Sequence, residues 1–145
     1  ENKAIAEHEG VVVQLNEMNL FKAAPESVNK AKLIDCIWFK NGRLMPAVLE
    51  IEHSTGVLSG LTRMQNFKNA FPPFETRYVI VADDDMREKV FECCNRDQFR
   101  DMNAKFFPYS AVEEMYSLLT RRHISGVNEK FIDSFMEDPL EVSLN

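Results

Sequence analysis

An asparagine–glycine pair at positions 41 and 42 separates two runs of strand-forming residues and limits the folds open to this chain. The run LIDCIWF occupies residues 33–39, and the run PAVLEIEH occupies residues 46–53. Asn-Gly between two such runs is a strong signal of a β-hairpin with a two-residue turn. We therefore expect a pair of antiparallel strands in the first third of the chain.

The patterns on either side of the hairpin predict alternating helices and strands. RYVIVA at 77–82 is almost wholly apolar, as in strands buried on both faces. An apolar stripe with helical spacing follows the hairpin, and it predicts a helix there. Ser54 or Thr55 is expected to cap this helix. The expected order is a helix over about 3–20, a loop over 23–31, the hairpin, a helix to about 69, a strand at 77–82, a helix over 84–95, a strand at 105–109, a helix over 111–122 and a last short helix. This α-β-β-α-β-α-β-α order predicts the α/β class, with a mixed central sheet flanked by helices.

Composition and length fit one domain over residues 1–145. The hydrophobic share is 45%, and no apolar run is long enough to span a membrane. The chain starts without methionine or a signal peptide, so we expect a piece of a larger protein. Three cysteines, an odd number, indicate a reducing compartment and hence a cytoplasmic location. The net charge of −6 argues against a freestanding nucleic-acid binder.

Two glutamates end the second strand of the hairpin. Side chains two apart in a strand share a face, so Glu50 and Glu52 point the same way, roughly 7 Å apart along the chain. Like charges held in this way repel each other unless a cation or water separates them. We therefore expect a partner that neutralises the charge of these two carboxylates.

The hairpin adds a third carboxylate to that face. With a two-residue turn, Lys40 pairs with Arg43, and Asp35 then lies opposite Val48. Glu50 becomes the diagonal neighbour of Asp35, about 7–8 Å away at the backbone. Directly paired residues share a face, so the aspartate and both glutamates are expected on one sheet surface.

Two interpretations of this surface remain open. It is either an ordinary solvated sheet face, or a site for a hard divalent cation such as Mg²⁺, which prefers carboxylate and carbonyl oxygens. Such an ion polarises a phosphodiester and generates a hydroxide nucleophile near neutral pH. Aspartate is disfavoured in strands, which supports the metal site.

These residues resemble the PD-(D/E)XK nuclease superfamily. Asp35, then Glu50-Ile51-Glu52 across a hairpin and followed by a helix, looks like its D…ExK pattern. The string LEIEHSTGVLSGLTRM at 49–64 is similar to restriction-endonuclease-like domains with E-x-E-H-[ST]-T and S-G-L-x-R-M motifs, and EHEGVVVQL at 7–15 resembles their first-helix pattern. The resemblance implies a restriction-endonuclease-like fold and Mg²⁺ (or Mn²⁺) held by Asp35, Glu50, the Ile51 carbonyl and Glu9.

One position departs from the family pattern. The usual third-position lysine is Glu52 here, and the residue before Asp35 is Ile34 rather than proline. Some restriction enzymes of the superfamily also carry glutamate there. The change makes a second metal, or Glu52 as the base that deprotonates the attacking water, the expected alternative. Asp35, Glu50 and Glu52 are thus the predicted catalytic residues.

Four residues are candidates for DNA contact: His53, Arg63, Lys40 and Arg43. His53 faces away from the two glutamates if the strand is extended, and packing or capping is its alternative role. The Arg63 guanidinium lies on the next helix, where it can hold a phosphate or be an ordinary exposed helix arginine.

The leading hypothesis is a metal-dependent DNA endonuclease domain of a restriction or phage-defence system. The alternative is a catalytically inactive domain of the same fold that serves as a nucleic-acid-binding or assembly module. Because phosphate contacts dominate DNA affinity and this domain is acidic, we expect a homodimer or a separate DNA-reading domain to supply further basic surface.

Overall fold

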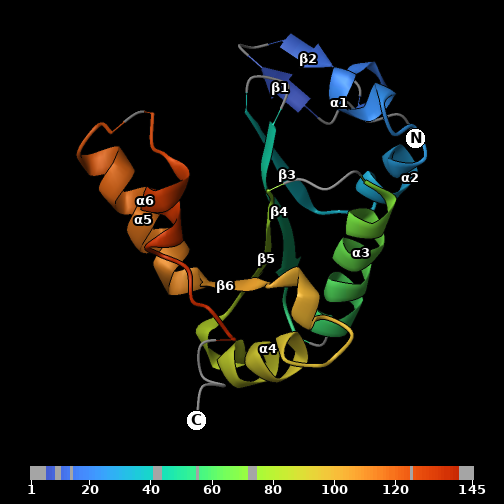
Figure 1. The fold of residues 1–145 in the computed structure, drawn as a ribbon. Coiled ribbons are helices and arrows are strands. Elements are labelled where there is room, and N and C mark those ends of the chain that lie inside the picture. The colour runs from blue at the N-terminus through green and yellow to red at the C-terminus, as the bar shows by residue number, and fades with distance from the viewer. Residues whose placement is uncertain are drawn as a thin grey trace.

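The computed structural model describes residues 6–8, 11–13, 15–40, 44–54, 56–71, 75–124 and 126–140. Its main sheet has the strand order β3-β4-β5-β6 (Figure 1). The strands are β3 (Cys36–Lys40), β4 (Leu44–Glu52), β5 (Arg77–Ala82) and β6 (Lys105–Pro108). β3 is antiparallel to β4, while β4, β5 and β6 run parallel to one another. The sheet is therefore mixed, as the sequence predicts.

Helices connect the parallel strands and cover both faces of the sheet. They are α3 (Val57–Ala70), the 3₁₀ turn η2 (Asp84–Met86), α4 (Arg87–Cys94), the 3₁₀ turn η3 (Arg100–Met102), α5 (Tyr109–Arg121) and α6 (Glu129–Asp133). α3 joins β4 to β5, and α4 lies between β5 and β6. Figure 1 shows α3 on one side of the sheet and α5 with α6 on the other. The predicted α/β class with a helix-flanked mixed sheet is confirmed, and the arrangement is consistent with a restriction-endonuclease-like fold. No described helix has the length and apolar character needed to cross a membrane.

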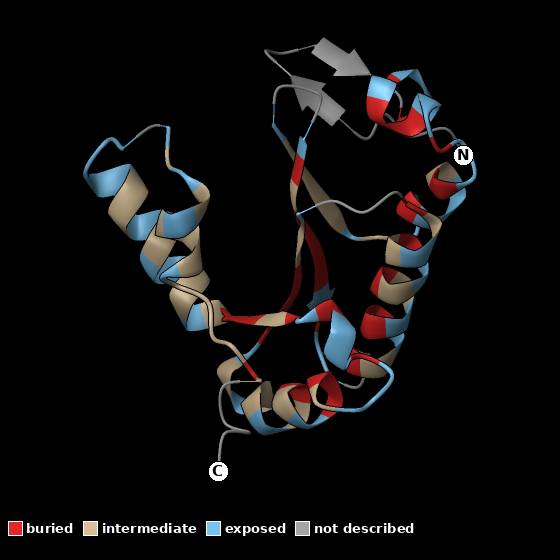
Figure 2. Cartoon of the chain, in the orientation of Figure 1, coloured by how far each residue is buried: buried red, intermediate tan, exposed pale blue. Residues whose placement is uncertain are grey.

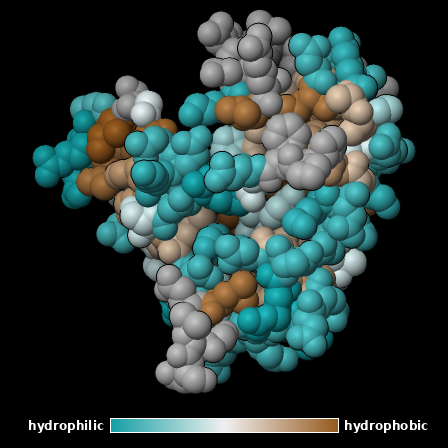
Figure 3. Space-filling model, viewed as in Figure 1, coloured by the Kyte–Doolittle hydropathy of each residue, from teal (hydrophilic) through white to brown (hydrophobic). Residues whose placement is uncertain are grey.

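Strand alternation divides the core between the two faces. Val48, Ile80 and Phe106 belong to the cluster packed with α3 and α4, whereas Val79 and Phe107 belong to the cluster under α5. β5 is buried on both faces, which explains why its sequence is a continuous apolar run (Figure 2). The surface is mostly hydrophilic in the view of Figure 3, and hydrophobic side chains gather over the α5–α6 region.

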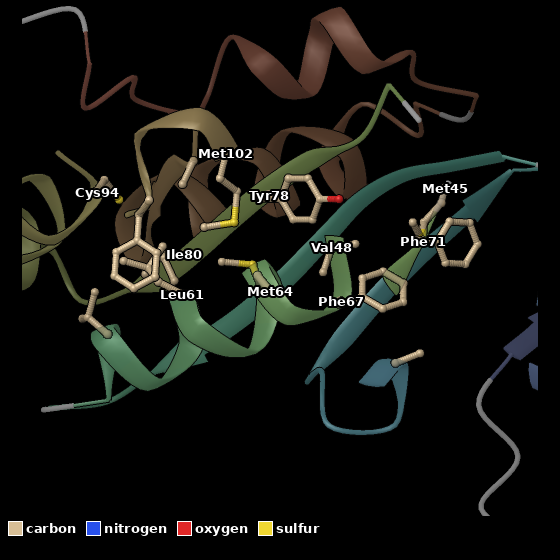
Figure 4. Packing of buried hydrophobic residues seen from close by; sticks show 14 of the residues in the cluster. Met45, Val48, Leu61, Met64, Phe67, Phe71, Tyr78, Ile80, Cys94 and Met102 are labelled. Carbon is tan, nitrogen blue, oxygen red and sulfur yellow. The ribbon is translucent and has the colours of Figure 1, made fainter. Parts of the chain in front are cut away.

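The predicted apolar stripe of α3 is the main contact with the sheet. Leu61, Met64 and Phe67 have no exposed surface, and Figure 4 shows them along the helix facing Val48 and Ile80. Burying each such side chain contributes about 1.5–3 kcal/mol. This packing fixes the position of α3 over β4, and thus the position of every polar group on the same two elements.

The predicted N-terminal helix over 3–20 is wrong. The segment contains two short antiparallel strands, β1 (Ala6–His8) and β2 (Val11–Val13), followed by η1 (Leu15–Glu17) and α1 (Asn19–Lys22). Three consecutive β-branched valines favour extended backbone, and this preference outweighs the helical spacing of the apolar residues. The loop predicted over 23–31 is also partly wrong, because it contains α2 (Ser27–Ala31).

The hairpin exists, but its register differs from the prediction by two residues. Ile37, not Asp35, lies opposite Val48, and the register shifts between Trp38 and Lys40 so that Lys40 lies opposite Leu44. The predicted turn at Asn41 and Gly42, and Arg43 after it, fall outside the described residues. Because strands alternate with a period of two, a two-residue offset keeps the same side chains on the same face. It also brings Asp35, just before β3, beside Glu50 rather than diagonal to it.

Candidate functional site

Glu50 and Glu52 lie on the face of β4 that α3 covers. Glu50 has no exposed surface, and Glu52 is 7% exposed. The interpretation of an ordinary solvated sheet face is therefore wrong for these two residues, because the helix packs directly on them. Charged groups are rarely buried to this degree unless they are paired.

The partner is Arg63, which reaches back from α3 to the end of β4. Its Nε donates to Oε1 of Glu50 at 3.1 Å, and its Nη2 donates to Oε2 at 2.7 Å. The same Nη2 donates to Oε1 of Glu52 at 3.3 Å. A planar guanidinium matches a carboxylate in this two-bond geometry. One guanidinium thus bridges the two carboxylates and offsets one of their two negative charges.

Two glycines of α3 make room for the Glu52 carboxylate. A Cβ at Gly60 would lie 2.4 Å from Oε1 of Glu52 and 3.2 Å from Cβ of Glu50. A Cβ at Gly56, the N-cap residue of α3, would lie 2.0 Å from Oε2 of Glu52. Any larger residue would push against this carboxylate. Neither glycine was predicted to belong to the site, although their four-residue spacing places them on one side of the helix.

Thr55 falls outside the described residues, and Ser54 does not cap this helix. Its N-cap is Gly56, which makes no side-chain cap hydrogen bond. The cap predicted at Ser54 is therefore wrong, and the Glu52 carboxylate instead packs beside the first turn of α3, where the helix dipole favours negative charge.

Asp35 approaches the same place from the start of β3. It is exposed, and its Oδ2 accepts a hydrogen bond of 2.9 Å from the Ile51 backbone N–H. Its charge helps to raise the pKa of Glu50, so the two carboxyl groups lie within interaction range. We call the four residues Asp35, Glu50, Glu52 and Arg63 the carboxylate–arginine cluster.

Burial dominates the electrostatics of this cluster. It raises the pKa of Glu50 to about 7; the hydrogen bond from Arg63 opposes the shift, and Asp35 reinforces it. Burial also raises the pKa of Glu52, against the charge of Arg63. The hydrogen bond to Glu50 raises the pKa of Arg63, which stays protonated. Glu50 is therefore a carboxyl group poised to gain or lose a proton near neutral pH.

The donor chemistry of the cluster suits a hard divalent cation. Asp35 and Glu50 offer carboxylate oxygens, and three carboxylates against one guanidinium leave two negative charges uncompensated. In the arrangement seen, however, Arg63 takes both oxygens of Glu50, and Glu52 is turned toward the glycines of α3. Across the described part of the chain, no group of three or more His, Cys, Asp or Glu side chains is arranged to hold a metal ion.

The other predicted site residues lie apart from the cluster or outside the described ranges. His53 is exposed at the end of β4, and its Nδ1 lies 3.4 Å from the Tyr109 hydroxyl of α5, on the face opposite Glu50 as predicted. Lys40 donates to Oε1 of Glu129 at 3.2 Å. Glu9 and Arg43 fall among the residues that are not described.

Comparison with known proteins places the chain in a family. A family model described as the type II restriction enzyme NmeDI C-terminal domain matches residues 1–139. The type II restriction enzyme NmeDI of Neisseria meningitidis serogroup C is 50% identical over 139 residues, which cover 94% of this chain and 40% of that protein. The chain thus spans less than half the length of this relative. No solved structure matches it. Taken with the mixed sheet and the acidic cluster, these matches show that the chain belongs to the family of NmeDI-type restriction enzyme C-terminal domains.

Proposed function

We propose that this chain is the nuclease domain of a restriction enzyme and hydrolyses DNA phosphodiester bonds with a divalent metal ion. Its relative is a type II restriction enzyme by name. The observation that carries the proposal is the two-residue offset of the hairpin, which brings Asp35 beside a buried Glu50. Two adjacent carboxylates, one of them poised near neutral pH, are the ligands that Mg²⁺ or Mn²⁺ prefers.

Each residue of the cluster has a distinct task in this proposal. Asp35 and Glu50 hold the metal, with the Ile51 carbonyl and Glu9 as further predicted ligands. The bound metal supplies Lewis-acid activation of the phosphate and of a water molecule. α3 excludes water from the rear of Glu50, because its apolar stripe seals that face. The role of Glu52 as the catalytic base stays a prediction.

DNA contact stays predicted for His53, Arg63, Lys40 and Arg43, and a homodimer or a separate DNA-reading domain remains part of the proposal. With 17 basic against 23 acidic residues this chain has a net charge of −6, which opposes the approach of DNA phosphates. We expect weak DNA binding by the 145-residue chain without divalent metal.

A second function deserves a test because of one specific contact. Arg63 occupies both oxygens of Glu50, as in a structural ion pair. The matched region also covers only 40% of the relative, so catalysis can reside in its other part. A catalytically inactive nucleic-acid-binding or assembly module would have these properties.

Plasmid cleavage separates the two functions. We expect the chain to cut plasmid DNA with Mg²⁺ and not in EDTA, and Asp35→Asn to abolish cutting. Asp97→Asn, which removes an exposed carboxylate in the loop after α4, is the matched control and should cut like the wild type. In parallel, Mg²⁺ or Mn²⁺ should raise the melting temperature of the wild type but not of Asp35→Asn. Absence of both effects would favour the inactive module.

A further inference from the structure

The Arg63 guanidinium and a divalent cation need the same two oxygens. Arg63 donates to Oε1 of Glu50 at 3.1 Å and to Oε2 at 2.7 Å. A cation bound to this carboxylate would face the guanidinium at short range, and two positive charges so close repel strongly where water is excluded. Glu50 has no exposed surface, so its carboxylate is reached only from the side of Arg63 or of Asp35, which lies within hydrogen-bond range of it. Because of the charge repulsion, we expect the guanidinium and the cation to compete for Glu50.

The Glu52 carboxylate can hold the Arg63 guanidinium after a cation displaces it from Glu50. Glu52 already accepts from Nη2 of Arg63 at 3.3 Å. Its own oxygens are enclosed by Gly56 and Gly60, and its side chain is 8% exposed, so it has little freedom to turn toward an incoming metal. Arg63 has a third of its side chain exposed, whereas both glutamates are buried, so the guanidinium has the most room to move of the three.

We propose that Arg63 is the resident counter-cation of Glu50 in the metal-free protein, that a divalent cation binds Glu50 by exchange with this guanidinium, and that Glu52 retains Arg63 during the exchange. The inference rests on the proposed function, since it assumes that the metal binds at Asp35 and Glu50. It assigns Glu52 a positioning role in place of metal ligation or proton transfer. It also explains why glutamate occupies this position: lysine there would repel the guanidinium, whereas glutamate holds it.

The direct test follows the Arg63 side chain by NMR during titration with Ca²⁺, which supports binding without turnover. The Nε–H group of Arg63 gives its own signal, assigned by its loss in Arg63→Lys. We expect this signal to shift with the same midpoint as the binding isotherm. The Nε–H signal of Arg87, which donates to Glu137 at 2.9 Å, should stay unchanged and serves as the internal control. Calcium binding with an unmoved Arg63 signal would overturn the exchange and leave the proposed function standing.

A variant pair supplies an independent readout. Arg63→Met keeps an unbranched stem and frees both Glu50 oxygens, so Ca²⁺ affinity measured by calorimetry should rise at least about tenfold. Arg87→Met makes the same substitution in another two-bond ion pair and should bind Ca²⁺ within about twofold of wild type. Equal or weaker binding by Arg63→Met would overturn the proposal. Calcium binding by neither the wild type nor Arg63→Met would overturn the proposed metal site as well.

Discussion

Two arginine–carboxylate pairs in this protein have nearly the same bonds and very different surroundings. Arg63 donates hydrogen bonds to Glu50 from Nε and Nη2. Arg87 donates to Glu137 from the same two atoms, with both donor–acceptor distances at 2.9 Å. A second carboxylate lies near each arginine: Glu52 at 3.3 Å from Arg63 and Asp84 at 3.7 Å from Arg87. The Glu50 side chain is fully buried, whereas that of Glu137 is 35% exposed.

The difference indicates which pair serves stability alone. The Arg87–Glu137 pair ties the segment after α6 to α4, and water still solvates both groups. In the Arg63–Glu50 pair the carboxylate has lost that solvation, although a third of the arginine side chain is exposed, and apolar residues of similar size often serve a fold equally well where an ion pair is buried. A buried carboxylate with a raised pKa, next to the exposed Asp35, is consistent with the proposed metal site.

The largest expected effect is the loss of Arg63. Arg63→Met leaves the buried Glu50 without its partner and should lower the free energy of unfolding by about 3 kcal/mol near pH 8. Arg87→Met, at a solvated pair, should cost about 1 kcal/mol or less. Urea denaturation in EDTA measures both. Equal costs for the two substitutions would remove the distinction between the pairs.

The next effect is the pH dependence of stability. Folded Glu50 keeps its proton up to about pH 7, while the unfolded chain releases it near 4.5. Between these values the folded state binds more protons, so the stability contributed by this proton is lost as pH rises through about 7. Glu50→Gln should lack this loss, which amounts to about 1–3 kcal/mol between about pH 5 and pH 8. The comparison uses denaturation in EDTA, and identical pH profiles would contradict the raised pKa.

A smaller effect is expected at Gly60. Alanine gains about 1 kcal/mol of helix propensity over glycine, but its Cβ would crowd Glu52 Oε1 at 2.4 Å. Overpacking of this kind costs about 1–3 kcal/mol, so we expect Gly60→Ala to be net destabilising. The double variant Gly60→Ala/Glu52→Ala removes the crowded carboxylate and should recover the loss relative to Glu52→Ala alone. Net stabilisation by the single substitution would show that Glu52 moves freely.

The smallest effect on stability is expected at Lys40, whose ion pair with Glu129 is exposed. Lys40→Ala should change the free energy of unfolding by about 0.5 kcal/mol or less. If Lys40 contacts a DNA phosphate, as predicted, the same substitution should reduce the salt dependence of DNA binding by a slope of about 1. Fluorescence anisotropy over a range of salt concentrations in Ca²⁺ measures this slope. An unchanged slope would remove Lys40 from the DNA-contact set.

Periodicity predicted the centre of this fold well, because the buried strand at 77–82 and the stripe of α3 have strong and unambiguous patterns. It predicted the N-terminal region badly. There, three consecutive valines favour a strand and the spacing of the apolar residues favours a helix, and the local sequence does not show which preference is stronger. The hairpin register failed by two residues: Lys40 lies opposite Leu44 rather than Arg43, and the register shifts by one further residue between Trp38 and Lys40, an irregularity with no signature in the sequence.

The candidate site shows the same division. Because side chains two residues apart in a strand share a face, Glu50 and Glu52 were correctly placed on one face, whatever the register of the hairpin. Their burial was missed, since it depends on how closely α3 approaches β4, and Gly56 and Gly60 leave room for the Glu52 carboxylate at that approach. The partner of the two carboxylates was for the same reason expected to be a metal or water, whereas the structure supplies Arg63.

The most direct test of the metal site is anomalous diffraction from a crystal of this chain soaked in Mn²⁺. We predict an anomalous peak between the carboxylates of Asp35 and Glu50, with metal–oxygen distances of about 2.0–2.3 Å and carboxylate carbons about 4–7 Å apart. The Arg63 guanidinium should have left Glu50 and remained on Glu52. A crystal at saturating Mn²⁺ that shows no peak at Asp35 and Glu50, with Arg63 still bonded to both Glu50 oxygens, would contradict the metal site.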